Sequence, residues 1–118
     1  MLSIHQENAK VFMAFCDVTR LRILELLRDF ERSATVLQQQ IGTGQSTLSH
    51  HMKILVESGI VAARKSGKWT YYSICENGGR YASGLLELLT SKSKTTESNI
   101  SDTNILDITN KEKGDQTL

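Results

Sequence analysis

The sequence predicts a mainly α-helical domain with one small β-hairpin, an α+β fold. Three observations lead to this expectation. Apolar residues recur at helical spacing up to about residue 57 and again over residues 80–91. The period changes after Gly59, where aromatic and β-branched residues follow a Ser-Gly turn. The chain has 118 residues with a hydrophobic content of 39%, which suffices for one modest core but not for two.

Five helices are expected, because five apolar stripes at helical spacing are separated by capping residues or by glycine. They cover residues 4–16, 18–29, 34–41, 45–57 and 80–91. Asp17 can cap the second helix, whose apolar residues are so numerous that it should be buried on most sides. Ser33 can cap the third helix, after a connection at 29–32. The chain is expected to break again at Asn77-Gly78-Gly79, before the last helix.

The third and fourth helices are joined by the short turn Gly42-Thr43-Gly44, which is typical of a helix-turn-helix. In the fourth helix Leu48, Met52 and Leu55 form an apolar stripe that should face the core. The opposite face carries no carboxylate before Glu57, so it is either an ordinary solvated face or a surface for an anionic partner. Ser, Gln and His can hydrogen-bond base edges, and Lys can bind phosphate. The candidate DNA-contacting residues of this helix are Gln45, Ser46, Thr47, Ser49, His50 and Lys53.

A basic hairpin follows directly, with strand-like segments on either side of Ser66-Gly67. Its tip carries Arg64, Lys65 and Lys68, which are further candidate DNA contacts. Residues 45–74 contain four Lys or Arg and one Glu, although the whole chain has a net charge of only +1. A basic tip suits phosphates or the minor groove beside a recognition helix. This order of elements predicts a winged helix-turn-helix that binds double-stranded DNA.

The stretch QSTLSHHMKILVESGIVAARKSGKWTYYSI, residues 45–74, resembles the recognition helix and wing of the ArsR/SmtB family of bacterial repressors. DVTRLRILELL, residues 17–27, resembles that family's second helix, and the resemblance covers roughly residues 9–90. It implies a homodimeric repressor that binds an inverted repeat in its own operator. It further implies a dimer interface made by the first and last helices. The DNA contacts it implies are Gln45, Ser46, Ser49, His50 and the wing residues Arg64 to Lys68.

The chain departs from this family at the positions where many members sense metals. Those members carry a Cys-x-Cys pair near the start of the first helix of the helix-turn-helix, where this sequence has Ser33-Ala34-Thr35. Others use Asp and His on the last helix, but residues 76–91 contain neither. Hydroxyl groups are poor ligands for soft metal ions. We therefore expect no metal site and no cofactor, and the sequence does not identify an inducer.

Cys16 and Cys75 are too few for a disulfide framework. They permit two interpretations: a thiol switch that responds to oxidants, or two small apolar residues buried in a packed domain. An enzyme is not expected, because Ser49 and His50 are neighbours on a helix and do not face each other. No orienting acid accompanies them.

Residues 1–91 are expected to form the DNA-binding and dimerisation domain, and residues 92–118 a polar, mobile tail. No segment approaches the roughly 20 apolar residues of a membrane span, and the N-terminus lacks the apolar region of a secretory signal. We therefore expect a cytoplasmic transcriptional repressor without membrane contact. Two alternatives stay open: a winged-helix module that binds proteins instead of DNA, and a thiol-redox-responsive regulator.

Overall fold

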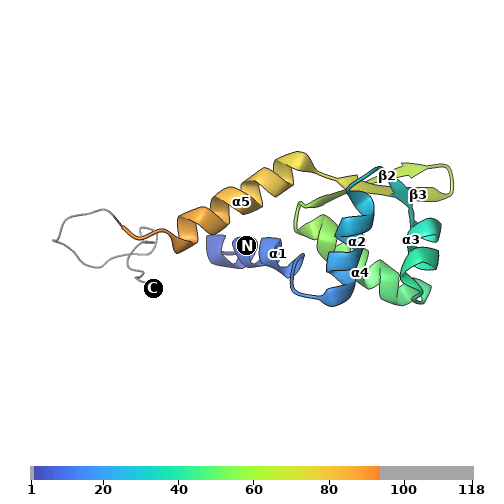
Figure 1. Ribbon diagram of the computed structural model, residues 1–118, viewed down its shortest axis with the longest axis horizontal. Helices are drawn as coiled ribbons and strands as arrows, with labels where there is room; N and C mark the ends of the chain where they lie inside the picture. Colours follow the sequence, from blue (N-terminus) through green and yellow to red (C-terminus); the bar gives the residue numbers. More distant parts are fainter. Residues whose placement is uncertain (1, 94–118) are drawn as a thin grey trace. The chain divides into compact units, whose positions relative to one another are not determined.

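The computed structural model describes residues 2–93, which contain five α-helices and a three-stranded antiparallel sheet (Figure 1). The elements are α1 (Ile4–Met13), α2 (Val18–Leu27), β1 (Arg32–Ser33), α3 (Ala34–Ile41), α4 (Gln45–Glu57), β2 (Val61–Ser66), β3 (Trp69–Ile74) and α5 (Glu76–Thr90). The predicted α+β fold is confirmed. The bounds of α3 and α4 agree with the prediction, whereas α1 and α2 end earlier, at Met13 and Leu27.

The chain divides into two compact units, Met1–Ala82 and Ser83–Leu118. Helix α5 begins in the first unit and ends in the second. The tail predicted at residues 92–118 lies outside the described residues, except for Lys92 and Ser93. Among the helices of residues 2–93, none is long and apolar enough to cross a membrane.

The starts of the first three helices are capped by side chains that accept hydrogen bonds from otherwise unpaired N–H groups. Ser3 caps α1. Asp17 caps α2 and accepts from two backbone N–H groups at 2.8 and 3.2 Å, while Ser33 caps α3 and accepts from one at 3.2 Å. The predicted caps at Asp17 and Ser33 are confirmed. Helix α4 differs, because its N-cap residue is Gly44 and no side chain caps its first turn.

The core of the first unit lies where α1 to α4 pack together beside the start of β2. On α4 the stripe Leu48, Met52 and Leu55 is buried, as its spacing predicts. Helix α4 lies against α1, α2, α3 and β2, so its buried face is the centre of this unit. The other buried apolar residues of the unit are Val11, Ala14, Ile23, Leu27, Leu37, Ile41, Ile60, Val61 and Ala82.

Helix α2 is not buried on most sides, so this prediction is wrong. Val18 is 76% exposed and Leu21 is 49% exposed, whereas Arg20, between them, is only 6% exposed. The guanidinium of Arg20 donates from Nε to the carbonyl oxygen of Met13 at 3.0 Å and from Nη1 to Nδ1 of His51, also at 3.0 Å. These hydrogen bonds allow a charged side chain to occupy a position that the periodicity assigns to an apolar one.

The sheet contains one short strand, β1, that the sequence pattern does not predict. The strand order is β1-β3-β2, with both pairs antiparallel. Strand β1 has only two residues, too few to show a period. The hairpin turn is Gly67-Lys68, since Ser66 pairs with Trp69, one residue later than predicted. Gly67 has a φ of 61°, a left-handed conformation that glycine adopts without steric cost.

Helix α5 begins at Glu76, so Asn77-Gly78-Gly79 lies within its first turns and does not break the chain as predicted. Gly78 lies directly against the backbone of Gly59, and a Cβ atom at this position would collide with the carbonyl oxygen of Gly59. Nearby, the N–H of Cys75 donates to the carbonyl oxygen of Ile60 at 2.8 Å. Gly78 thus permits the close approach of two backbone segments.

Candidate nucleic-acid interface

The outer face of α4 is polar and lies opposite the buried stripe of that helix. All of the helix residues predicted to contact DNA are exposed: Gln45, Ser46, Thr47, Ser49, His50 and Lys53. The first turn of α4 contains no acidic residue. His50 is exposed, whereas His51 turns inward, and the centroids of the two rings lie 5.9 Å apart with an angle of 55° between the planes. The structure thus brings the predicted helix residues to one solvent-facing surface.

The N-terminal end of α4 is open. A Cβ atom at Gly44 would meet no heavy atom within 4 Å, so there is room for a side chain at the N-cap position. Because no side chain caps the first turn, its N–H groups and the partial positive charge of the helix dipole remain available. In a helix-turn-helix, this end of the second helix enters the major groove.

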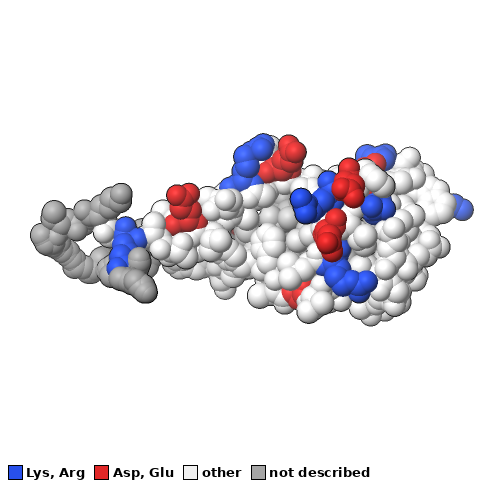
Figure 2. Space-filling model, viewed as in Figure 1, with Lys and Arg blue, Asp and Glu red and all other residues white. Residues whose placement is uncertain are grey.

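The wing consists of β2, the Gly67-Lys68 turn and β3, and it presents Lys65 and Lys68 to solvent. The Nζ of Lys68 lies 5.6 Å from the centroid of the Trp69 ring, which is itself 44% exposed. Neither lysine forms an ion pair with any carboxylate within residues 2–93. Figure 2 shows a basic side chain at the hairpin end, whereas basic and acidic side chains are interspersed over the region of α2.

Arg64 is held differently from the two wing lysines. Its Nε and Nη2 donate to the two carboxylate oxygens of Glu31 at 3.0 and 2.6 Å, and its guanidinium lies 4.7 Å from the centroid of the Tyr71 ring. The hydrogen bond from Arg64 lowers the pKa of Glu31, although desolvation acts in the opposite direction. The same bond raises the pKa of Arg64. Arg64 therefore has a partner within the protein, whereas both lysines point to solvent.

A polar cluster joins α4 to α2 beneath this surface. Nδ1 of His51 accepts from Arg20, and a carboxylate oxygen of Asp17 lies 3.9 Å from the same nitrogen. Partial desolvation raises the pKa of Asp17, but backbone N–H donors, the charge of Arg20 and the charge that His51 carries when it is protonated outweigh this effect, so that pKa is lowered. From the sequence, Asp17 is predicted only as a cap, and no role is predicted for Arg20. A charged residue within the apolar stretch was no sufficient signal, because Arg22 on the same helix is exposed.

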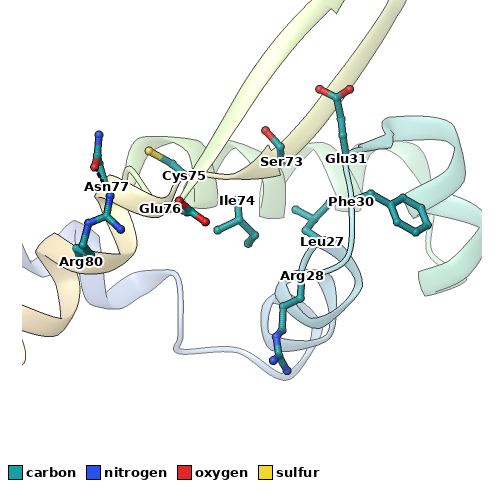
Figure 3. A pocket seen from close by; sticks show the side chains of 10 residues that line it. All are labelled: Leu27, Arg28, Phe30, Glu31, Ser73, Ile74, Cys75, Glu76, Asn77 and Arg80. Atoms are coloured by element: carbon teal, nitrogen blue, oxygen red, sulfur yellow. Dashed lines mark hydrogen bonds between the residues drawn. The ribbon is translucent and has the colours of Figure 1, made fainter.

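The two cysteines lie outside the core. Cys16 is exposed, Cys75 is half-buried and both are free, so the interpretation as two buried apolar residues is wrong. Cys75 lines an open pocket of about 590 Å³ formed by the end of α2, the end of β3 and the start of α5 (Figure 3). In Figure 3, Arg28 and Phe30 of this lining point away from Cys75. In the part of the chain that is described, no three His, Cys, Asp or Glu side chains gather as they would around a metal ion.

Known proteins share this arrangement. A family model described as a helix-turn-helix domain matches residues 17–64. An uncharacterized HTH-type transcriptional regulator of Methanocaldococcus jannaschii is 41% identical over 75 residues, which are 62% of this chain and 83% of the relative. A homodimeric winged helix-turn-helix DNA-binding domain of Mycobacterium bovis, a possible ArsR-family regulator, aligns with a TM-score of 0.61 and 30% identity over 70% of this chain and 78% of that one. This chain belongs to the ArsR family.

Another relative is the arsenical resistance operon repressor of Staphylococcus aureus. It is 37% identical over 70 residues, which are 59% of this chain and 67% of the repressor. The predicted winged helix-turn-helix and the predicted family are thus confirmed, and this ArsR-family protein is a DNA-binding transcriptional regulator. The alternative of a module that binds proteins instead of DNA is not favoured.

Proposed function

We propose that this protein represses transcription by placing the outer face of α4 in the major groove of its operator. The observation that carries the proposal is the division of α4 into a buried apolar stripe and an exposed face without acidic residues in its first turn. Serine, glutamine and histidine side chains of this face can donate to or accept from base edges. The proposed contacts of α4 are Gln45, Ser46, Thr47, Ser49, His50 and Lys53.

The wing has two parts in this proposal. Lys65 and Lys68 bind phosphates, because they are exposed cations without a carboxylate partner in residues 2–93. Arg64 supports the wing, because its bidentate pair with Glu31 connects β2 to the segment that precedes β1. A carboxylate that already neutralises a guanidinium reduces its attraction to phosphate. Arg64 is therefore a weaker candidate for a DNA contact than its presence in the basic cluster indicated.

We further propose that the protein acts as a homodimer through α1 and α5. Helix α1 exposes Ile4 (62%) and Met13 (45%), and α5 exposes Leu86 (54%) and Leu88 (56%). Large exposed apolar side chains on two helices are typical of an interaction surface. The similar domain of M. bovis is homodimeric. A two-fold dimer would present two α4 helices to half-sites about one DNA turn apart, so the expected target is an inverted repeat upstream of the protein's own gene.

The DNA contacts can be tested by titrating that upstream duplex and a scrambled competitor at several salt concentrations. Replacing Ser49 and His50 together by Ala should reduce the preference for the operator by about 1–3 kcal/mol per lost base contact. Lys68→Ala should weaken binding to both duplexes and lower the salt slope by about 1. Arg22→Ala removes an exposed charge of α2 and serves as the matched control. A double variant with normal operator preference would refute the assignment of α4.

The dimer can be tested by sedimentation velocity at micromolar concentration. Leu88→Glu places a charge on the exposed apolar side of α5 and should convert the dimer to a monomer with weaker operator binding. Glu87→Gln, on the same helix, is the control and should leave the dimer intact. If the wild-type protein is monomeric both alone and on the operator, the dimer proposal is wrong.

A further inference from the structure

One buried cation is connected to the recognition helix by a histidine. Arg20 is 6% exposed, and the two hydrogen bonds of its guanidinium go to the carbonyl oxygen of Met13 and to Nδ1 of His51, each at 3.0 Å. No carboxylate of residues 2–93 lies within ion-pair distance of Arg20. A buried guanidinium is costly unless its donors are satisfied. The imidazole of His51 is therefore a substantial part of what keeps Arg20 buried between α2 and α4.

The direction of this hydrogen bond determines the state of the imidazole. A guanidinium is permanently charged and can only donate, so Nδ1 of His51 must be the acceptor. The ring is then neutral and carries its proton on Nε2. A proton on Nδ1 would remove the acceptor and place a second cation beside Arg20. The carboxylate of Asp17, 3.9 Å from Nδ1, is the acceptor that a protonated ring would find.

The charged groups around His51 come from two places. Arg20 and Asp17 belong to α2 and its N-cap, and His50 is the neighbouring ring on α4. From α1, α3 and β2, the other elements packed against α4, no charged side chain forms a hydrogen bond or ion pair with the ring within the described residues. Arg20 and Asp17 are therefore the charged groups beside the ring, and the charge of His50 has to be held constant in any test.

We propose that Arg20 is a positioning residue for the recognition helix, acting through neutral His51, and that a proton on His51 releases this connection and weakens operator binding. The proposal rests on the proposed DNA-binding face of α4. His51 directly follows His50 of that face, so a movement of α4 that separates His51 from Arg20 also displaces His50. Hydrogen bonds to base edges depend on distance and angle, and the side chains that form them have to be held within about 0.5 Å of the productive geometry.

The first test measures operator affinity between about pH 8 and pH 5.5, the range in which histidine ordinarily titrates. His50→Gln is compared with the double variant His50→Gln, His51→Gln. Glutamine at position 51 offers Arg20 a carbonyl acceptor that does not titrate. Because both proteins lack His50, its own titration cancels. We expect the single variant to lose about tenfold in operator affinity on acidification relative to the double variant, the factor for one lost hydrogen bond to a charged group. Equal pH profiles would overturn the proposal.

The second test concerns Arg20. In the His50→Gln background, Arg20→Met should lower the preference for the operator over scrambled duplex at pH 8 and abolish the pH dependence. Melting curves at each pH identify any loss due to unfolding. If Arg20→Met does not fold, Arg20→Lys retains the charge but lacks the planar donor pair, and it should show the same reduced preference. Full operator preference and an unchanged pH profile in a folded Arg20 variant would show that Arg20 does not position α4.

A third measurement requires no DNA. The imidazole ¹⁵N shifts of His51 in the free protein should show the tautomer with its proton on Nε2 at about pH 8 and a change at Nδ1 on acidification. A proton on Nδ1 at pH 8 would overturn the proposal whatever the role of α4. If the tautomer is as expected but affinity does not depend on pH, the positioning role fails. The proposed DNA-binding face of α4 is tested separately: it would be refuted if the double variant Ser49→Ala, His50→Ala kept its normal preference for the operator.

Discussion

Helices α2 and α4 pack against each other but use their residues differently. Helix α4 buries leucine and methionine and exposes polar side chains, whereas the start of α2 buries Arg20 and exposes Val18 and Leu21. The inner face of α4 is held by close packing, which depends on shape. At Arg20, α2 is held by hydrogen bonds, which depend on direction. Helix α4 is therefore held by both close packing and hydrogen bonds.

The largest expected effect is a difference in stability loss between a substitution on the buried face of α4 and one on the exposed face of α2. Leu55 is fully buried, so Leu55→Ala should lower the free energy of unfolding by about 2–5 kcal/mol. Leu21→Ala removes the same atoms from a side chain that is 49% exposed, and it should change stability by less than about 0.5 kcal/mol. Urea denaturation measures both. Equal losses would contradict this difference in burial between Leu55 and Leu21.

The second prediction concerns the point where the segment after α4 meets α5. Gly78→Ala places a methyl group against the carbonyl oxygen of Gly59, and it should cost about 1–3 kcal/mol of stability. Gly79 is the matched control, because a Cβ atom there meets nothing within 4 Å. Gly79→Ala should instead raise stability by about 0.5–1 kcal/mol through helix propensity. Thermal melts that rank the two variants in the opposite order would contradict the close approach at Gly78.

The third prediction uses the charged cap of α2. The pKa of Asp17 is lowered in the folded protein, so its ionised form contributes stability above the ordinary aspartate pKa of about 3.9. That contribution should be lost as the pH falls through the lower, folded value. Asp17→Asn retains a capping oxygen without the charge, so its stability should fall less on acidification below about pH 4. Urea midpoints at a series of pH values test this, and parallel curves for both proteins would contradict it.

The smallest expected effect concerns the uncapped start of α4. Gly44 has an extended backbone with room for a side chain, so Gly44→Ser should stabilise the protein by about a few tenths of a kcal/mol. Gly44→Asp should stabilise it similarly but weaken binding to every duplex, because its carboxylate would face phosphates. Thermal melts and DNA titrations of the two variants separate these effects. Unchanged DNA affinity in Gly44→Asp would place the start of α4 away from the DNA.

Local signals were sufficient to predict the helix-turn-helix. Ser33, Gly42, Gly44 and Gly59 mark the ends of α3 and α4, and the spacing of apolar residues gave the buried stripe of α4 correctly. Contacts between distant segments could not be predicted. The pair Glu31–Arg64 joins residues 33 positions apart and lies beside the short β1–β3 pairing. Glycine is required at position 78 because a side chain there would collide with Gly59, which is also distant in the sequence. The polar face of α4 was therefore predictable, whereas the attachments that hold α4 and the wing were not.

The contact between Gly59 and Gly78 has a mechanical consequence. It brings the start of α5 against the segment that leads from α4 into β2, with no side chain between the two backbones. The hydrogen bond from the N–H of Cys75 to the carbonyl oxygen of Ile60 closes the same junction. Side chains can absorb a small displacement by changing rotamer, but two backbones in direct contact cannot. A displacement of the first turn of α5 is therefore transmitted through this contact to the base of the wing, which is displaced with it.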